Sequence, residues 1–195
     1  MKRRFFTLIE LMISIVLFCL IFLSAGGIFF SILHAWTRQK NTIELVQETR
    51  WALDFMANEL RHALQIVNNK PREGSYSNQI WFILDLNNDG NGDLTVRYQQ
   101  AGPTLRRGQK AGKQFVEGAE PGWNFTPICT NIANTGTNKP FYRHSSPDQD
   151  LFTITLVVRP NRDQPEGWLN RNITLATTVR LRNYIGDYKP GGGKN

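Results

Sequence analysis

Cysteine is scarce in this chain, with only two among 195 residues, and their positions exclude a stabilising internal disulfide. Cys19 lies inside a long apolar run, whereas Cys129 lies in the much more polar remainder of the chain. A disulfide needs two Cα atoms within about 7 Å, which segments of such different polarity do not offer. We therefore predict no disulfide within one chain and expect Cys129 to be a small buried apolar residue.

Motifs of common catalytic sites are also missing. His34, His62 and His144 are scattered, and none has a Cys or His at metal-ligand spacing. There is no Gly-x-Ser-x-Gly sequence and no Gly-rich phosphate loop. Ser145 and Ser146 follow His144 in a stretch that is more typical of a loop than of a catalytic dyad. The sequence therefore predicts a protein that is not an enzyme and holds no cofactor.

Strong charge is lacking as well. The formal net charge is +7, and three of these positive charges come from Lys2, Arg3 and Arg4. The remaining excess is dispersed, and we expect the basic stretches 106–110 and 180–182 to be solvated faces. This distribution predicts no direct nucleic-acid partner.

No charged side chain occurs from Leu11 to Leu33, a run of about 23 residues. As a helix it would be roughly 35 Å long, enough to cross a bilayer. The run is too long for the apolar core of a secretory signal peptide and ends without a small-x-small cleavage pattern. Basic residues before the run place the N-terminus in the cytosol. We expect a single-pass protein of the inner (cytoplasmic) membrane with a periplasmic or extracytoplasmic C-terminal domain.

Glu10 is a lone carboxylate at the front of this apolar run. An ionisable group there costs up to a few kcal/mol unless it is neutralised. It either pairs with a cation or extends back to the headgroups, and the residues around it favour the first interpretation.

Those residues are Phe6-Thr7-Leu8-Ile9-Glu10-Leu11-Met12, preceded by the basic residues 2–4. This stretch resembles the type IV prepilin signature of pilins and type II secretion pseudopilins. The resemblance implies that a prepilin peptidase removes residues 1–5 between Phe5 and Phe6, that Phe6 is then N-methylated, and that Glu10 guides filament assembly. Phe5 departs from the family, which almost always has Gly before the cleavage point.

The next segment predicts a continuation of the helix. Residues 34–67 contain no Pro or Gly, and their apolar residues recur at spacings of three, four and seven: Ile43, Val46, Leu53, Met56, Leu60, Ala63 and Val67. Polar residues, including Glu48 and Glu59, populate the other faces. We predict one helix over about residues 6–67, with a membrane part (6–33) and an amphipathic part (34–67). Gly26-Gly27 is expected to be a point of flexibility or local melting.

The pattern after Pro71 changes to that of short strands. Apolar or alternating runs predict strands at 79–84, 94–98, 151–158 and 172–181, with a short one near 140–143. Residues 99–150 are otherwise expected to be irregular, and the tail 189–195 disordered. We predict an α+β fold in which a domain of residues 72–188 lays an antiparallel sheet on the helix. The resemblance to pilins implies the lollipop shape of that family.

Residues 47–61 and 176–183 resemble the post-membrane helix and last strand of PilW-like minor pilins and J-type minor pseudopilins. Major pilins usually close a C-terminal loop with a disulfide, which this chain cannot form. The resemblance therefore indicates a minor subunit.

One loop has oxygen side chains at alternate positions, with Gly90 at the site of the sharp turn of an EF-hand-like loop: Asp85, Asn87, Asp89 and Asp93. The bidentate Glu of such a loop is replaced by Val96. The same residues suit a plain hairpin loop, which we favour over a calcium site.

Two functions from different classes remain. The first is a minor pilin or pseudopilin that inserts into, primes or caps a pilus, a secretion pseudopilus or a DNA-uptake filament. The resemblance implies as partners other pilins, the prepilin peptidase and methyltransferase, and an inner-membrane assembly platform. The second is a single-span, membrane-anchored binding module that does not polymerise.

Overall fold

The computed structural model describes residues 7–67, 71–87, 89, 92–112, 122–161, 166–167, 170–182, 184 and 187–188. The chain divides into two units, residues 1–43 and 44–195, and the helix α1 (Leu8–Arg61) contributes to both. The strands that follow are β1 (Ala63–Val67), β2 (Ser75–Ser77), β3 (Gln79–Leu84), β4 (Leu94–Ala101), β5 (Thr104–Ala111), β6 (Asn124–Cys129), β7 (Phe141–Arg143), β8 (Leu151–Val158), β9 (Ile173–Arg180) and β10 (Asp187–Tyr188).

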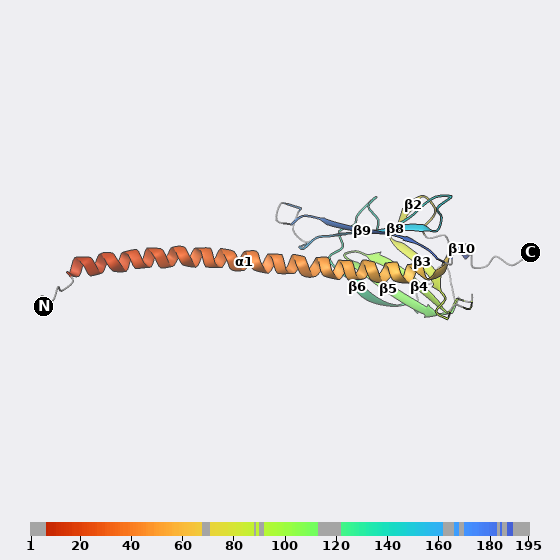
Figure 1. Ribbon diagram of the computed structural model, residues 1–195, viewed down its shortest axis with the longest axis horizontal. Coiled ribbons are helices and arrows are strands. Elements are labelled where there is room, and N and C mark those ends of the chain that lie inside the picture. Colours follow the sequence, from red (N-terminus) through yellow and green to blue (C-terminus); the bar gives the residue numbers. More distant parts are fainter. Residues whose placement is uncertain are drawn as a thin grey trace, which may run out of the picture. The chain divides into compact units, whose positions relative to one another are not determined.

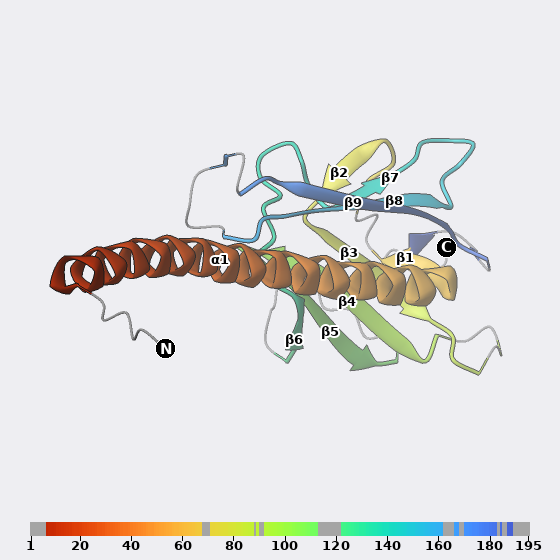
Figure 2. The ribbon, with the colours of Figure 1, turned by 60° about the vertical axis from the view of Figure 1, so that its left-hand side comes forward.

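The strands form two sheets in the described part of the chain. Sheet A has the order β10-β1-β3-β4-β5-β6, and sheet B has the order β2-β7-β8-β9. All neighbours are antiparallel except β1 and β10, which pair in parallel. Figures 1 and 2 show β8 and β9 of sheet B on one side of the C-terminal part of α1, and β4, β5 and β6 of sheet A on the other. The α+β class is confirmed, but the predicted single antiparallel sheet is instead two sheets, one of them mixed.

The C-terminal part of α1 is the centre of the core of the second unit. Its buried residues follow the three-and-four spacing of one helical face: Leu45, Thr49, Ala52, Leu53, Met56, Ala57 and Leu60. They form one apolar cluster with residues of sheet A, such as Phe82 and Leu105, and of sheet B, such as Phe152 and Leu156. Each large apolar side chain buried in this way contributes about 1.5–3 kcal/mol to stability. Burial against strands is thus confirmed for Leu53, Met56 and Leu60 of the predicted face, whereas Ile43 is exposed and Val46 half-buried.

The predicted helix is too long at its C-terminal end. α1 ends at Arg61, where the amide of His62 donates to the carbonyl of Glu59 at 3.1 Å, and residues 63–67 form β1. Apolar residues at 63, 64, 66 and 67 suit a helix face or a doubly buried strand, so periodicity alone does not separate the two. Residues 63–67 form a strand because they pair with β3 and β10, and Ile66 and Val67 then have 0% exposure.

The strand predictions at 79–84 and 151–158 match β3 and β8 in full, and those at 94–98, 140–143 and 172–181 match β4, β7 and β9 within a few residues. The prediction that 99–150 is irregular is wrong, because this region also contains β5 and β6. Their sequences carry Gly108 and Pro127 and few apolar residues, so they lack the usual strand signal. The leader 1–5 and the tail 189–195 lie outside the described residues.

α1 remains helical through Gly26 and Gly27, so the local melting expected there is absent. A glycine costs a helix up to about 1 kcal/mol relative to alanine, which a helix of 54 residues tolerates.

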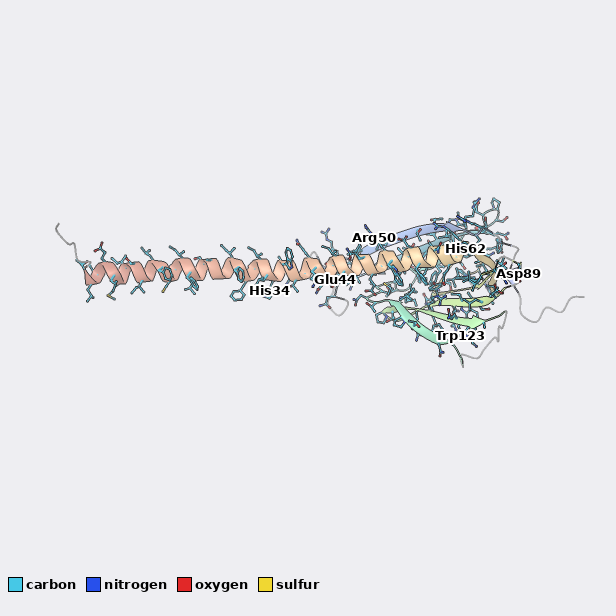
Figure 3. All side chains as sticks on the ribbon, turned by 60° about the horizontal axis from the view of Figure 1, so that its bottom comes forward. His34, Glu44, Arg50, His62, Asp89 and Trp123 are labelled. Atoms are coloured by element: carbon cyan, nitrogen blue, oxygen red, sulfur yellow. The ribbon has the colours of Figure 1, made fainter. Side chains whose placement is uncertain are left out.

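The face of sheet A that points away from α1 carries a stack of aromatic and cationic side chains. The Arg97 guanidinium lies 4.4 Å from the ring centroid of Trp81, and its Nη2 donates to Gln79 Oε1 at 2.9 Å. Trp123, labelled in Figure 3, stacks on Phe125 with a centroid distance of 6.0 Å. Both rings lie over Gly108, where a Cβ atom would come within 2.8 Å of Trp123 and 3.0 Å of Phe125. The rings of Trp123 and Phe125 can therefore pack here only because residue 108 has no side chain.

Candidate functional site

The apolar part of α1 exposes its large hydrophobic side chains. Those between Leu8 and Leu33 have exposed fractions from 45% to 78%. Among the described residues, α1 is the one helix whose length and composition would let it cross a membrane. Contiguous apolar surface of this size has to be covered by lipid or by other helices. The structure is therefore compatible with a single-pass membrane anchor.

Glu10 lies in the first turn of α1 and is exposed. The carbonyl of Thr7 accepts the amides of Glu10 at 3.1 Å and Leu11 at 3.2 Å, so Thr7 is the N-cap and Glu10 the third helical residue. A carboxylate is favoured at this end of the helix dipole. Within the described part of the chain, the Glu10 carboxylate has neither a hydrogen bond nor an ion pair.

Thr7 and Glu10 have the spacing of a capping box, which the sequence analysis did not consider. Neither side chain makes the reciprocal hydrogen bonds of that motif with a described residue. Phe5 and Phe6, the predicted processing and methylation residues, lie outside the described residues.

A second group of functional interest was missed by the sequence analysis. Glu59 of α1 accepts two hydrogen bonds from Arg107 of β5, one from Nε at 3.0 Å and one from Nη2 at 2.5 Å. The hydroxyl of Tyr98, on β4, donates to Glu59 Oε2. This Glu59 cluster, formed by Glu59, Tyr98 and Arg107, ties the last turns of α1 to the middle of sheet A.

Burial shifts the titration of the Glu59 cluster. The pKa of Tyr98 is raised well above its usual value, first by burial and then by the negative charge and hydrogen bond of Glu59. Burial by itself lowers the pKa of Arg107, but the hydrogen bond and charge of Glu59 outweigh it, so this pKa is raised. The cluster therefore keeps a neutral phenol and a charged guanidinium over the whole physiological pH range.

The cluster corrects the prediction for the basic stretch 106–110. The Arg107 side chain is only 17% exposed and Glu59 only 16%, so Arg107 is not part of a solvated face. Arg180 and Arg182 are exposed, as predicted. The sequence feature that could have identified Glu59 as a partly buried residue is its position between Met56 and Leu60, at the border of the buried helical face.

Cys129 is buried with 0% exposure, as predicted, and lies beside α1. Its Sγ is 3.7 Å from Thr49 Oγ1. Next to it, Glu48 Oε1 accepts the amide of Thr130 at 2.9 Å. Burial raises the pKa of the Cys129 thiol to about 11, which opposes thiolate chemistry. Cys19 and Cys129 are both free thiols, in agreement with the prediction of no internal disulfide.

The loop between β3 and β4 holds itself together with its own side chains. Asp93 Oδ2 accepts the amides of Leu86 at 2.9 Å and Asn87 at 3.3 Å. The amide of Asp89, labelled in Figure 3, donates to Asp85 Oδ1 and Asn87 Oδ1. These are contacts of a polar turn. No cluster of three or more His, Cys, Asp or Glu suited to a metal occurs among the described residues. Asn88, Gly90 and Asn91 lie outside them.

The three histidines are not brought into a common site. His34 is exposed on α1, and His62, the residue that follows the last residue of α1, is exposed as well; both are labelled in Figure 3. His144 Nε2 lies 3.0 Å from Thr153 Oγ1, and its ring meets Tyr142 edge to face. These contacts give His144 a structural environment on the outer surface of sheet B.

The chain was compared with protein-family models, with curated proteins and with solved structures, and none of the three comparisons found a match.

Proposed function

We propose that this protein is a minor pilin or pseudopilin, a subunit that inserts into, primes or caps a type IV pilus or a type II secretion pseudopilus. In this proposal residues 1–5 are removed, Phe6 becomes the methylated N-terminus, and Glu10 takes part in assembly. The protein has a structural role and no catalytic one.

The observation that supports the proposal is the position of Glu10. It lies in the first turn of α1, at the start of an apolar surface whose residues are exposed as far as Leu33. A tethered module needs apolarity alone, so a carboxylate at this point favours a protein with a further task. In a bundle of packed helices, the free amine of a processed subunit would pair with Glu10 of a neighbouring subunit.

Electrostatics explains why such a pair would direct assembly. The α-amine of an incoming subunit has to enter the apolar environment of packed helices, and an unpaired charge there is strongly unfavourable. Removing one partner of a buried ion pair costs about 3–5 kcal/mol. Glu10 is the only carboxylate in the apolar segment, so it is the group able to neutralise that amine. It would thereby fix the axial register of neighbouring helices.

The continuity of α1 also supports a subunit rather than a tethered module. One helix of 54 residues supplies both the apolar segment and the central core residues of the second unit, Leu45 to Leu60. No loop or linker separates the two tasks. In the proposal the N-terminus remains on the cytosolic side before processing, since Lys2, Arg3 and Arg4 precede the span, and the β-rich unit lies outside the cytoplasm.

The test is Glu10→Leu in cells that make the filament. We expect membrane insertion and folding to survive, whereas co-purification with other pilins and incorporation into filaments fall sharply. Glu10→Asp should be intermediate, because the charge remains but reaches less far. Ser24→Leu is the matched control, since it also makes the span more apolar but keeps the carboxylate, and it should assemble normally. Normal assembly of Glu10→Leu would contradict the proposal and favour the tethered binding module.

A further inference from the structure

Among the described residues, the two sheets of the second unit have four edge strands, and three of these carry features that disfavour pairing with another chain. β2 has three residues and β10 has two. β6 contains Pro127, and its register with β5 shifts between Leu105 and Arg106. Very short strands, prolines and irregular registers are common devices that prevent edge-to-edge association.

β9 has none of these devices. It is eight residues long and pairs with β8 in one unbroken register, from Leu151↔Arg180 to Val158↔Ile173. It contains no Pro, Lys, Asp or Glu. Its one charge, Arg180, lies at the end of the strand and is bound to Asp148 at 2.6 Å. β9 is therefore a long, regular and nearly neutral edge.

The hydrogen-bonding groups at this edge can be assigned from the ladder. The amide of Leu181 donates to the carbonyl of Asp150 at 2.9 Å, so the odd-numbered residues of β9 bond to β8. In an antiparallel ladder the alternate residues point their N–H and C=O groups the other way. These are Thr174, Ala176, Thr178 and Arg180, and all four are exposed. Their backbone groups form no hydrogen bond with any residue that the structure describes.

Side chains along β9 define what would fit beside it. On the inner face, Ile173 and Leu175 pack against the core but are only partly buried. On the outer face, Thr174, Ala176 and Thr178 are small and uncharged. An added strand with apolar residues at alternate positions would cover the exposed parts of Ile173 and Leu175 and would continue the threonine-rich outer surface.

We propose that β9 is a site of β-strand addition, which binds an extended, uncharged segment of another polypeptide with apolar residues at alternate positions. Only an extended chain presents N–H and C=O groups at the repeat of the edge, about 6.8 Å for every second residue. The proposal goes beyond filament assembly through the N-terminal helices, because its binding surface lies on sheet B.

A second copy of β9 is not the occupant. Antiparallel pairing of two identical strands needs a two-fold axis perpendicular to the sheet. Figures 1 and 2 show β9 running lengthwise beside the C-terminal part of α1. The axis would therefore make residues 44–61 of α1 run in opposite directions in the two copies, whereas the subunits of the filament proposed above all share one direction. The occupant is a strand of a different polypeptide.

The test measures backbone amide exchange by NMR on the full chain in detergent micelles. The probe is a free, terminally blocked peptide with the sequence of residues 172–179, which is uncharged, has apolar residues at alternate positions and is not constrained by an anchor. At about 1 mM peptide, we expect exchange at Thr174, Ala176 and Thr178 to slow at least about tenfold. Exchange at Leu175 and Thr177, which bond to β8, should be slow with or without peptide.

Ala176→Pro removes an amide that points to the open edge and leaves the bonds to β8 intact, a position at which an edge strand tolerates proline. We expect this variant to lose the peptide-induced protection at Thr174 and Thr178. Ala176→Val keeps the amide and should retain the protection. Ala176→Lys provides a second disrupting variant if proline unfolds sheet B, which exchange at Leu175 and Thr177 would reveal. Unchanged exchange in the native chain, or protection that survives both disrupting variants, overturns the proposal.

Discussion

Glu59 and Arg107 are 48 positions apart in the sequence, yet they form a bidentate ion pair between the last turns of α1 and the middle of β5. Both side chains are less than one-fifth exposed, so solvent screens the pair only weakly. Through this pair and the adjacent Tyr98 hydroxyl, the border of the apolar face of α1 is attached to β4 and β5 of sheet A. Arg107 also lies 5.6 Å above the ring of Phe55, which positions its guanidinium from the helix side.

Glu59→Gln should therefore destabilise the second unit. The substitution leaves Arg107 and Tyr98 in place without the charge that compensates them, and hydrogen bonds to charged groups are worth about 1.5–3 kcal/mol. Thermal unfolding of the full chain in detergent, followed by near-ultraviolet circular dichroism, would measure the loss. Asp54→Asn is the matched control, since Asp54 is an exposed carboxylate on the same helix. Equal melting temperatures for the two variants would show that the cluster adds nothing to stability.

Gly108→Ala should destabilise sheet A, because the new Cβ would lie 2.8 Å from Trp123 and 3.0 Å from Phe125. Forcing an extra carbon into a packed contact costs about 1–3 kcal/mol. The fluorescence of Trp123 should change as its ring moves away. Gly167→Ala is the control, since a Cβ at that position meets nothing within 4 Å. A fully native spectrum and stability of Gly108→Ala would contradict the close packing of these rings.

Cys129 should be unreactive in the folded protein. Its pKa of about 11 lies above the usual value for a thiol, so the folded state holds the proton more tightly than the unfolded state does. The stabilisation due to this group is complete below the unfolded pKa, near 8.5, and is lost as pH rises toward 11. In a Cys19→Ser background, maleimide labelling at pH 7 should occur only after denaturation. Rapid labelling of the folded chain would show that the site is open.

Calcium should have little effect on the loop at Asp85, because its side-chain oxygens already accept amides of the same loop. We expect the melting temperature of the full chain to be the same with chelator and with calcium at about 1 mM, the range in which extracellular sites bind. Asp89→Ala should leave that comparison unchanged. A calcium-dependent rise in melting temperature that Asp89→Ala abolishes would establish a calcium site instead.

Processing at Phe5 gives a further measurable outcome. If residues 1–5 are removed as we propose, mass spectrometry of the membrane protein should find N-methylated Phe6 as the first residue. Phe5→Gly should raise the processed fraction, because a site adapted to glycine accommodates the small residue more easily. A chain that still begins at Met1 in cells with an active prepilin peptidase would remove the basis for its entry into a filament.

The sequence by itself determined those helices and strands whose apolar residues form an unbroken run or recur at a regular spacing. Leu8 to Leu60 is recognisable as helix because its apolar residues either run without interruption or recur at helical spacing, and β3 and β8 because they are short apolar runs bounded by polar residues. The position of Glu10 at the front of the apolar run was equally visible, because a single charge stands out in such a segment.

Only the tertiary structure decided where α1 ends, how the strands divide into two sheets, and which polar groups meet. Residues 63–67 became a strand because β3 and β10 offered hydrogen-bond partners, and local periodicity contains no information about partners. Glu59 and Arg107 each resembled solvated surface residues, since a charge pattern does not reveal a counter-charge that folding brings from another element. The edge position of β9 has the same origin. A strand's sequence shows that it can pair, whereas its place in the sheet order shows which side has no neighbour among the described strands.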